Sequence, residues 1–370
     1  MVNYLKLFVK RHVVKRVLFP LLLIFSPFLI TISAQNDTIA KKDKKHEPHK
    51  DDISLFGSDE ILNVNLYLDL ASFSKKPSKN DSFDGKMTIH INETDSVNRD
   101  VTVKYRGISR YEICTFPPMQ INFKKPLYSD SLKIKKLKLV THCQANNIND
   151  EYVVREYLVY KLYNALTDTS FRVRLLKVNY IDSKGNKRTI RKYGIFIEPL
   201  EFLAKRTNSV PVKTSSVNQS HIIASEMDRV AIFNYMVTNW DWSIPGQHNV
   251  EVIKPLSYNT DGLGVAVPYD FDLTGVVNAD YAIPPANLEI ENVRQPIFAG
   301  ICRSREVYTE DLKRFLADKS KLYSTVNDFP HLNQRAKKDI INFLDQFFDQ
   351  LEKPKSLDSL VDDFLNHCKK

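Results

Sequence analysis

The chain has 370 residues, of which 43% are hydrophobic, so it can bury a core large enough for one large domain or two smaller ones. Its formal net charge is +9, but five basic residues lie in the first 16 positions, which hold no acidic residue. Without them, 48 basic residues (53 minus 5) oppose 44 acidic ones, and this balance of +4 excludes a strongly basic nucleic-acid-binding protein.

The N-terminus is typical of a secretory signal peptide. Its basic start is followed by an apolar run from Val17 to Ile32 and then by the small residues Ser33 and Ala34. We therefore expect residues 1–34 to be removed on export, leaving a periplasmic or secreted protein with no transmembrane segment. An uncleaved membrane anchor is the alternative, but the run is shorter than about 18 residues and contains two prolines.

Residues 35–57 are rich in Lys, Asp, His and Glu and are predicted to form a disordered linker. The spacing of the four cysteines predicts neither a disulfide framework nor a zinc site. These cysteines are Cys114, Cys143, Cys302 and Cys368.

Alternating apolar residues from Leu62 to Leu70 predict a strand with one buried face. Similar short runs follow up to about residue 140, and an acid-rich start at residues 149–151 begins a helical pattern that extends to about Leu166. Two further strands, 171–182 and 189–200, are joined by a hairpin turn. Residues 58–205 are therefore predicted to be mostly β-structure with one helix.

Two features of this region point to ligand binding. Arg106 and Arg110 flank a glycine turn at a strand end, where guanidinium groups and backbone N–H groups together suit phosphate oxygens. An ordinary turn with solvated arginines is the alternative. Glu198 ends the last strand, where its carboxylate could hold a cation, pair with a lysine or cap the next turn.

In the second half of the chain, Ser225 is predicted to cap a helix from Glu226 to about residue 239. Two apolar strands, 250–253 and 264–268, then form a predicted hairpin around a polar turn at 259–262. Amphipathic patterns predict three closing helices that pack on the core. These helices lie near Glu310–Leu322, Asn333–Leu351 and Leu357–Cys368.

The predicted hairpin would bring polar residues from its two ends together. Asp241 and Asn249 precede its first strand, and Asp270 and Asp272 follow its second. Carboxylate and amide oxygens suit a hard cation such as Mg²⁺, and a lone carboxylate beside the cation can accept a proton. Alternatively, these residues only form turns around a tryptophan-rich core.

Three segments, together spanning about Leu62 to Asp272, carry a resemblance to a known family. Residues 106–110 read Arg-Gly-Ile-Ser-Arg, and residues 193–196 read Tyr-Gly-Ile-Phe. Residues 239–241 read Asn-Trp-Asp, followed by His-Asn at 248–249 and Pro-Tyr-Asp-Phe-Asp at 268–272. This order of motifs resembles the CotH-like atypical protein kinases, the family of spore coat protein H.

The resemblance implies an α+β, two-lobed protein-kinase-like fold with a β-rich N-lobe (58–205) and a mostly helical C-lobe (206–370). It implies transfer of the γ-phosphoryl group of ATP to a hydroxyl group of a protein substrate, with Mg²⁺ or Mn²⁺ as cofactor. Asp241 would orient the accepting hydroxyl and take its proton. The remaining roles would be metal binding by Asn249, Asp270 and Asp272, and cofactor binding by Arg106, Arg110 and Glu198.

The sequence also departs from the family pattern. Trp242 replaces a basic residue, and the strand expected to carry the nucleotide-clamping lysine, 117–123, contains none. Lys104, Lys124 or Lys138 could substitute for it. Two alternatives therefore stay open: a catalytically inactive kinase-like scaffold that binds an envelope protein or glycan, and a metal-dependent phosphoester hydrolase.

Overall fold

A computed structural model describes residues 52–107, 109–144, 146–213, 217–257 and 263–369, all within one compact unit, His46–Lys370. Three predicted segments lie outside the described residues: the signal peptide, residues 35–51 of the linker, and the polar turn of the hairpin at 259–262. Within the described ranges, no helix is both long enough and apolar enough to cross a bilayer.

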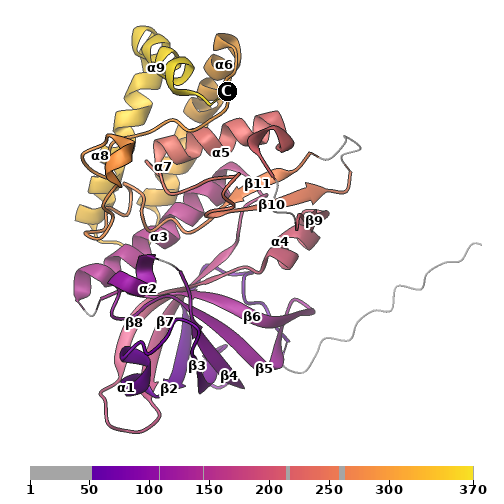
Figure 1. Cartoon of the computed structure of the whole chain (residues 1–370), viewed down its shortest axis with the longest axis vertical. Coiled ribbons are helices and arrows are strands. Elements are labelled where there is room, and N and C mark those ends of the chain that lie inside the picture. The colour runs from indigo at the N-terminus through magenta and orange to yellow at the C-terminus, as the bar shows by residue number, and fades with distance from the viewer. Residues whose placement is uncertain (1–51, 108, 145, 214–216, 258–262, 370) are drawn as a thin grey trace, which may run out of the picture. The chain divides into compact units, whose positions relative to one another are not determined.

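The first half of the unit is a closed β-barrel (Figure 1). Around the barrel the strands follow the order β5, β4, β3, β2, β7, β8, β6, and β6 pairs again with β5. Most neighbours are antiparallel, but β2 and β7 run parallel. The strands are β2 (Leu62–Leu68), β3 (Ser82–His90), β4 (Ser96–Tyr105), β5 (Met119–Ser129), β6 (Leu132–Val140), β7 (Val173–Asp182) and β8 (Ile190–Ile197).

This barrel shows that the expected two-lobed protein-kinase-like fold, with a β-rich N-lobe and a helical C-lobe, is wrong. A closed barrel of seven strands dominates the structure instead. The sheet closes because β6 pairs with β5 on one side and with β8 on the other. Closure leaves no free edge among these strands, which stabilises the backbone hydrogen bonds of every one of them.

The predicted alternation of β2 is confirmed. Its residues Leu62, Val64, Leu66 and Leu68 are buried, whereas the residues between them are more exposed. Side chains of a strand alternate between its two faces, so this pattern places one face of β2 in the barrel interior.

The predicted disordered linker, residues 35–57, extends too far towards the C-terminus, because its last residues belong to the folded unit. Residues 52 and 53 form strand β1 (Asp52–Ile53), which pairs in parallel with β5 outside the closed ring. Leu55 and Phe56 are buried in the barrel core. These apolar side chains are enough to order a segment whose composition is otherwise polar.

Most of the helical residues lie after the barrel, in the second half of the unit (Figure 1). The predicted helix near 310–322 is two helices that meet at Asp318, and Ser225 lies inside its helix instead of capping it. The helices are α1 (Leu70–Ser74), α2 (Ser109–Ile113), α3 (Asn147–Leu166), α4 (Leu200–Arg206), α5 (Ala224–Met236), α6 (Arg305–Ala317), α7 (Lys319–Asn327), α8 (Gln334–Glu352) and α9 (Pro354–His367).

Helix α3 packs against both the barrel and the helical half. It contacts β7 and β8 on one side and α7 on the other, as Figure 1 shows. Tyr157, Leu158, Tyr160 and Leu162 are almost fully buried, so α3 is buried on nearly all sides. Such a helix is stable only inside a core. A three-stranded sheet of β9 (Ser209–Pro211), β10 (Val250–Pro255) and β11 (Val265–Pro268) completes this region.

The expectation that the cysteines form no disulfide framework is also wrong. Cys114 bonds to Cys143, and Cys302 bonds to Cys368. Separations of 29 and 66 residues follow no recognisable spacing, so only the fold brings each pair together. Two disulfides are compatible with export, because such bonds persist in oxidising compartments.

Removing a disulfide should destabilise the protein. We expect Cys302→Ser with Cys368→Ser to lower the free energy of unfolding by about 2–4 kcal/mol, because the bond closes a long loop in the unfolded chain. Urea unfolding of the wild type and the double variant measures this difference. Thiol titration of the unreduced wild type should detect no free cysteine, and detection of four would contradict both bonds.

Candidate functional site

The predicted hairpin is confirmed, and it builds one end of the candidate site. β10 and β11 pair antiparallel with Val250 opposite Pro268. The backbone N–H of Tyr269 donates to the carbonyl oxygen of Asn249 at 2.9 Å, so pairing continues one residue further. Asn249 and Asp270 therefore lie at the same end of the hairpin, as the sequence predicts.

Asp241 is held by two side chains from the start of this hairpin. Asn249 Nδ2 donates to Asp241 Oδ2 at 2.9 Å and to its carbonyl oxygen at 2.8 Å. His248 Nε2 lies 2.8 Å from Asp241 Oδ1. Burial raises the pKa of Asp241, although His248 and the hydrogen bond from Asn249 offset part of this effect. Its carboxylate is thus fixed in place and more basic than an exposed aspartate.

Asp270 has an unusual backbone conformation, with φ +63°, and Asn249 has φ +53°. Asp and Asn tolerate this left-handed region better than most residues, so these side chains suit their backbone positions. The N–H of Asp270 donates to the Tyr160 hydroxyl at 2.8 Å, and Arg106 Nη2 lies 3.3 Å from Asp270 Oδ2. The buried Oδ1 atom has no hydrogen-bond partner among the described residues.

Asp272 lies deeper, in a buried ionic cluster with Arg110 and Glu156. Arg110 Nε is 3.5 Å from Asp272 Oδ2, and its Nη1 is 3.9 Å from Glu156 Oε2. Burial raises the pKa of Asp272 to about 6, with Arg110 opposing the rise. Burial and the neighbouring Asp272 hold the pKa of Glu156 well above its usual range.

The two arginines predicted to bind phosphate have different environments. Arg110 is 5% exposed, donates from Nη2 to the Thr141 carbonyl oxygen at 2.7 Å and lies over the Tyr281 ring. Because its guanidinium is buried and contacts only other groups of the protein, Arg110 stabilises the fold around the site. Arg106 is less buried and lies next to Asp270, so it is the arginine that an incoming anion can reach.

Of the three candidate lysines, the structure brings Lys138 to the site. Its Nζ atom lies 3.5 Å from Glu251 Oε1 and 3.9 Å from the centre of the Tyr269 ring. Burial lowers the pKa of Lys138 to about 8, and the nearby positive charge of Arg106 contributes. Lys124 instead pairs with Asp84 at 2.9 Å on the surface, and Lys104 is exposed.

A cavity of about 380 Å³ opens beside Lys138 and Glu251. It lies against β6 and the segment that follows β8. Its lining combines apolar and charged side chains, including Ile134, Leu137, Phe171, Ile197, Leu200, Lys133, Lys135, Lys136 and Glu201. A cavity lined by apolar side chains together with charged groups can hold a small molecule.

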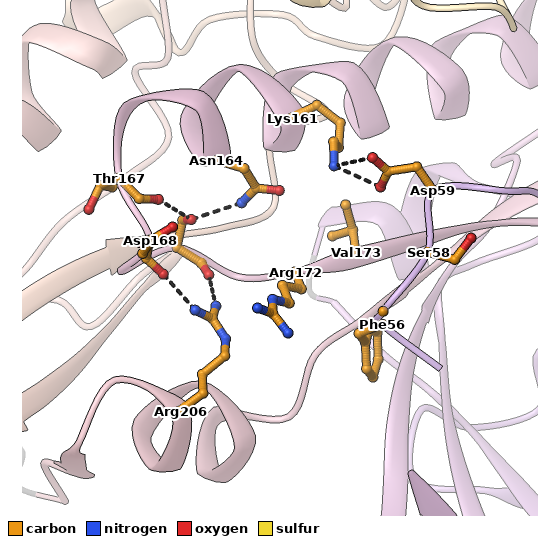
Figure 2. Close-up of a pocket in the computed structure, with 12 residues that line it drawn as sticks. Phe56, Ser58, Asp59, Lys161, Asn164, Thr167, Asp168, Arg172, Val173 and Arg206 are labelled. Carbon is orange, nitrogen blue, oxygen red and sulfur yellow. Dashed lines mark hydrogen bonds and ion pairs between the residues drawn. The ribbon is translucent and has the colours of Figure 1, made fainter. Parts of the chain in front are cut away.

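Glu198, predicted to bind the cofactor, has a different set of partners. Its carboxylate lies 2.9 Å from Arg206 Nε and accepts the backbone N–H of Arg172 at 3.0 Å. Glu198 lines the cavity beside Lys138, while Arg206 and Arg172 line a separate polar pocket of about 300 Å³ (Figure 2). The Glu198–Arg206 ion pair therefore separates the two spaces and supports the cavity wall.

The predicted metal ligands Asn249, Asp270 and Asp272 do not form a dense acidic cluster. Within the described residues, no three His, Cys, Asp or Glu side chains are placed to hold a metal ion. The donor chemistry nevertheless suits Mg²⁺ or Mn²⁺ bound together with phosphate, because Mg²⁺ in such sites takes only one or two carboxylates from the protein. The partnerless Oδ1 of Asp270 is the available oxygen.

Sequence reasoning missed several residues that shape this site. Glu156 and Tyr160 both face it from α3, and Tyr281 covers Arg110. The four-residue spacing of Glu156 and Tyr160 puts them on one helix face, which is a readable signal. The carbonyl of Thr141 could not be found from sequence, since any residue carries one.

Comparisons with known proteins give no family for this site. No model of a known protein family matches the chain, and no curated protein matches it at a significant level. The CotH-like resemblance and the residue roles that it implies therefore stay predictions.

The buried ring of His142, which follows Thr141 in the chain, stacks on Phe116 at 4.7 Å between centroids. Burial lowers the pKa of His142 from 6.5 to about 3. The unfolded chain therefore binds a proton between these values that the folded state does not, so stability falls as the pH is lowered from 6.5 towards 3.

Replacing this ring with one that does not titrate should flatten the pH dependence. Between pH 7 and pH 4.5, we expect the free energy of unfolding to fall less for His142→Phe than for the wild type. The difference between the two slopes should be at most about 1.4 kcal/mol per pH unit. Urea unfolding at several pH values measures both slopes. Equal slopes would mean that His142 is already accessible to protons in the folded state.

Proposed function

We propose that this protein is an exported, metal-dependent phosphotransferase that moves the γ-phosphoryl group of a nucleotide to a hydroxyl group of a protein substrate. In this proposal its site residues are CotH-like, although its fold is a closed barrel. Export would follow removal of residues 1–34 and would deliver the protein to the periplasm or the exterior.

One observation carries the proposal. Asp241, Asn249 and Asp270 lie at one end of the β10–β11 hairpin. Lys138, which lines the cavity, contacts Glu251 of the same hairpin and the ring of Tyr269, next to Asp270. Phosphoryl transfer needs a positioned acceptor, phosphate-binding cations and little covalent chemistry from the protein. In this proposal, Asp241 positions the acceptor, and Lys138 and Arg106 bind the phosphate groups.

Asp241 is the residue suited to receive the acceptor's proton. Its carboxylate is oriented by His248 and Asn249, and burial raises its pKa. A base gains strength as its pKa approaches the working pH, so burial improves Asp241 in this role. Its partial exposure leaves room for a hydroxyl group to approach.

The cavity and the two accessible cations are suited to the nucleotide. The apolar residues in the lining of the cavity, which include Phe171 and Leu200, suit a flat base. Lys138 and Arg106 lie towards Asp270, where they can pair with phosphate oxygens. We assign Arg110 and Glu198 to support of the site, since their charged groups are engaged within the protein.

Asn249 and Asp270, with Asp272 behind them, would hold a divalent cation. When bound, such a cation neutralises charge that develops on the transferred phosphoryl group. Asp270 offers its partnerless Oδ1 for this purpose, and the amide of Asn249 is fixed by Asp241.

A catalytically inactive scaffold is the second candidate, and a different observation favours it. Arg106 pairs with Asp270, and Arg110 pairs with Asp272. Each carboxylate that a metal ion would need already has a cationic partner from the protein. If those ion pairs persist in solution, the same surface would serve only to bind an envelope protein or glycan.

Two substitutions separate these functions. Asp270→Asn should abolish metal-dependent nucleotide binding, because it removes the charge that offsets the cation. Asp241→Asn should leave binding largely intact and slow phosphoryl transfer by about 10²–10⁴-fold, the usual effect of losing a positioned base. Calorimetric titration with manganese and ATP measures binding, and radiolabel transfer to a protein acceptor measures activity.

Asp358→Asn serves as the matched control, because Asp358 is an exposed carboxylate on α9. It should behave as the wild type in both assays. A wild-type titration that releases no heat with manganese and ATP would rule out the phosphotransferase and leave the scaffold.

A further inference from the structure

A third pocket, of about 320 Å³, lies near the end of β4 and the start of β5. Its lining is entirely cationic or neutral and contains no carboxylate. The lining residues are Lys79, Asn80, Lys104, Tyr105, Arg106 and Gln120. Such a pocket favours an anionic ligand on charge alone.

The barrel register explains why these side chains gather. Lys104 on β4 pairs directly with Gln120 on β5, and directly paired residues point to the same side of a sheet. Arg106 follows β4, and its N–H donates to the Pro118 carbonyl oxygen at 2.8 Å, which fixes it beside β5. Lys79 reaches the pocket from the loop between α1 and β3.

The positive charge of this pocket is not neutralised by the protein. Lys79 and Lys104 are both exposed, and neither forms an ion pair with any described residue. Arg106 contacts one carboxylate, that of Asp270. The pocket thus differs from the candidate site, where nearly every acidic group has a basic partner.

We propose that this pocket binds a phosphate-type dianion through Lys79, Lys104 and Arg106. Two ammonium groups and a guanidinium match the charge and hydrogen-bonding capacity of a tetrahedral phosphate group. Free phosphate and a phosphorylated side chain of a protein partner share this chemistry. The binding itself does not depend on the proposed phosphoryl transfer.

Arg106 links the pocket to Asp270. Arg106 lines the pocket, and its Nη2 atom lies 3.3 Å from Asp270 Oδ2. An anion in the pocket and Asp270 therefore compete for Arg106, and binding of the anion weakens the ion pair. Because such coupling is reciprocal, removing the charge of Asp270 should strengthen anion binding.

Calorimetric titration with inorganic phosphate, without nucleotide or metal, tests the site. Lys79→Ala combined with Lys104→Ala should weaken phosphate binding about 10–100-fold, the effect of losing one or two charge-assisted hydrogen bonds. The matched control is Lys75→Ala with Lys125→Ala, since these lysines are exposed near the same loop and strand but outside the pocket. It should bind phosphate as the wild type does.

Asp270→Asn adds an opposite and more specific effect, namely tighter phosphate binding by several-fold. Asparagine keeps the tolerance for a positive φ that this position needs. Equal phosphate affinity in the wild type and the Lys79/Lys104 variant would overturn the proposal. A wild type that binds neither inorganic phosphate at about 10 mM nor a phosphoserine peptide would overturn it as well.

A phosphoserine peptide and its unphosphorylated form separate the two sources of the anion. Binding of the phosphopeptide alone assigns the pocket to a phosphorylated protein, whereas binding of inorganic phosphate alone assigns it to the free ion. A flat titration with manganese and ATP would refute the phosphotransferase but would leave the phosphate result standing.

Discussion

The buried guanidinium of Arg110 is the contact on which the candidate site depends. It joins α2 to the Thr141 carbonyl after β6, to Glu156 on α3 and to Asp272 after β11. These segments lie far apart in the sequence, and the Cys114–Cys143 bond holds two of them together. Removing one member of a buried ionic cluster leaves the others uncompensated, typically at a cost of about 3–5 kcal/mol. By holding Asp272, Arg110 therefore also helps to fix the position of Asp270, two residues earlier in the chain.

This cluster has two carboxylates for one buried arginine, so full ionisation of both would leave an excess negative charge. The raised pKa values of Glu156 and Asp272 act against this excess, because a proton on either carboxylate would remove one negative charge. Burial is the main cause of both shifts. The charges of Asp272 and Asp270 add to the shift of Glu156, and those of Asp270 and Asp241 add to the shift of Asp272.

Local patterns in the sequence predict local structure well here. The alternation of β2 and the β10–β11 hairpin, with Asn249 and Asp270 at one end, follow from period-two burial and need no distant partner. Closure of the barrel depends on β6 pairing with both β5 and β8. The β5–β6 pairing is a local hairpin, but the pairing of β6 with the distant β8 leaves no mark in the spacing of residues. The same limit applies to Glu198, whose partner Arg206 comes from the following helix, and to both disulfides.

The pairing of charges within the candidate site also constrains the ligands it can accept. A free cation would have to displace Arg106 from Asp270, and a free anion would have to displace Asp270 from Arg106. Either exchange leaves one protein charge without a partner in a partly buried place, which is costly. A ligand that carries both a cation and phosphate groups replaces the two partners together, so Asp270 and Arg106 each gain a new counter-charge. The pocket of Lys79 and Lys104 shares Arg106 with this ion pair, but its two lysines have no carboxylate partner among the described residues, so a simple anion can bind to them without displacing one.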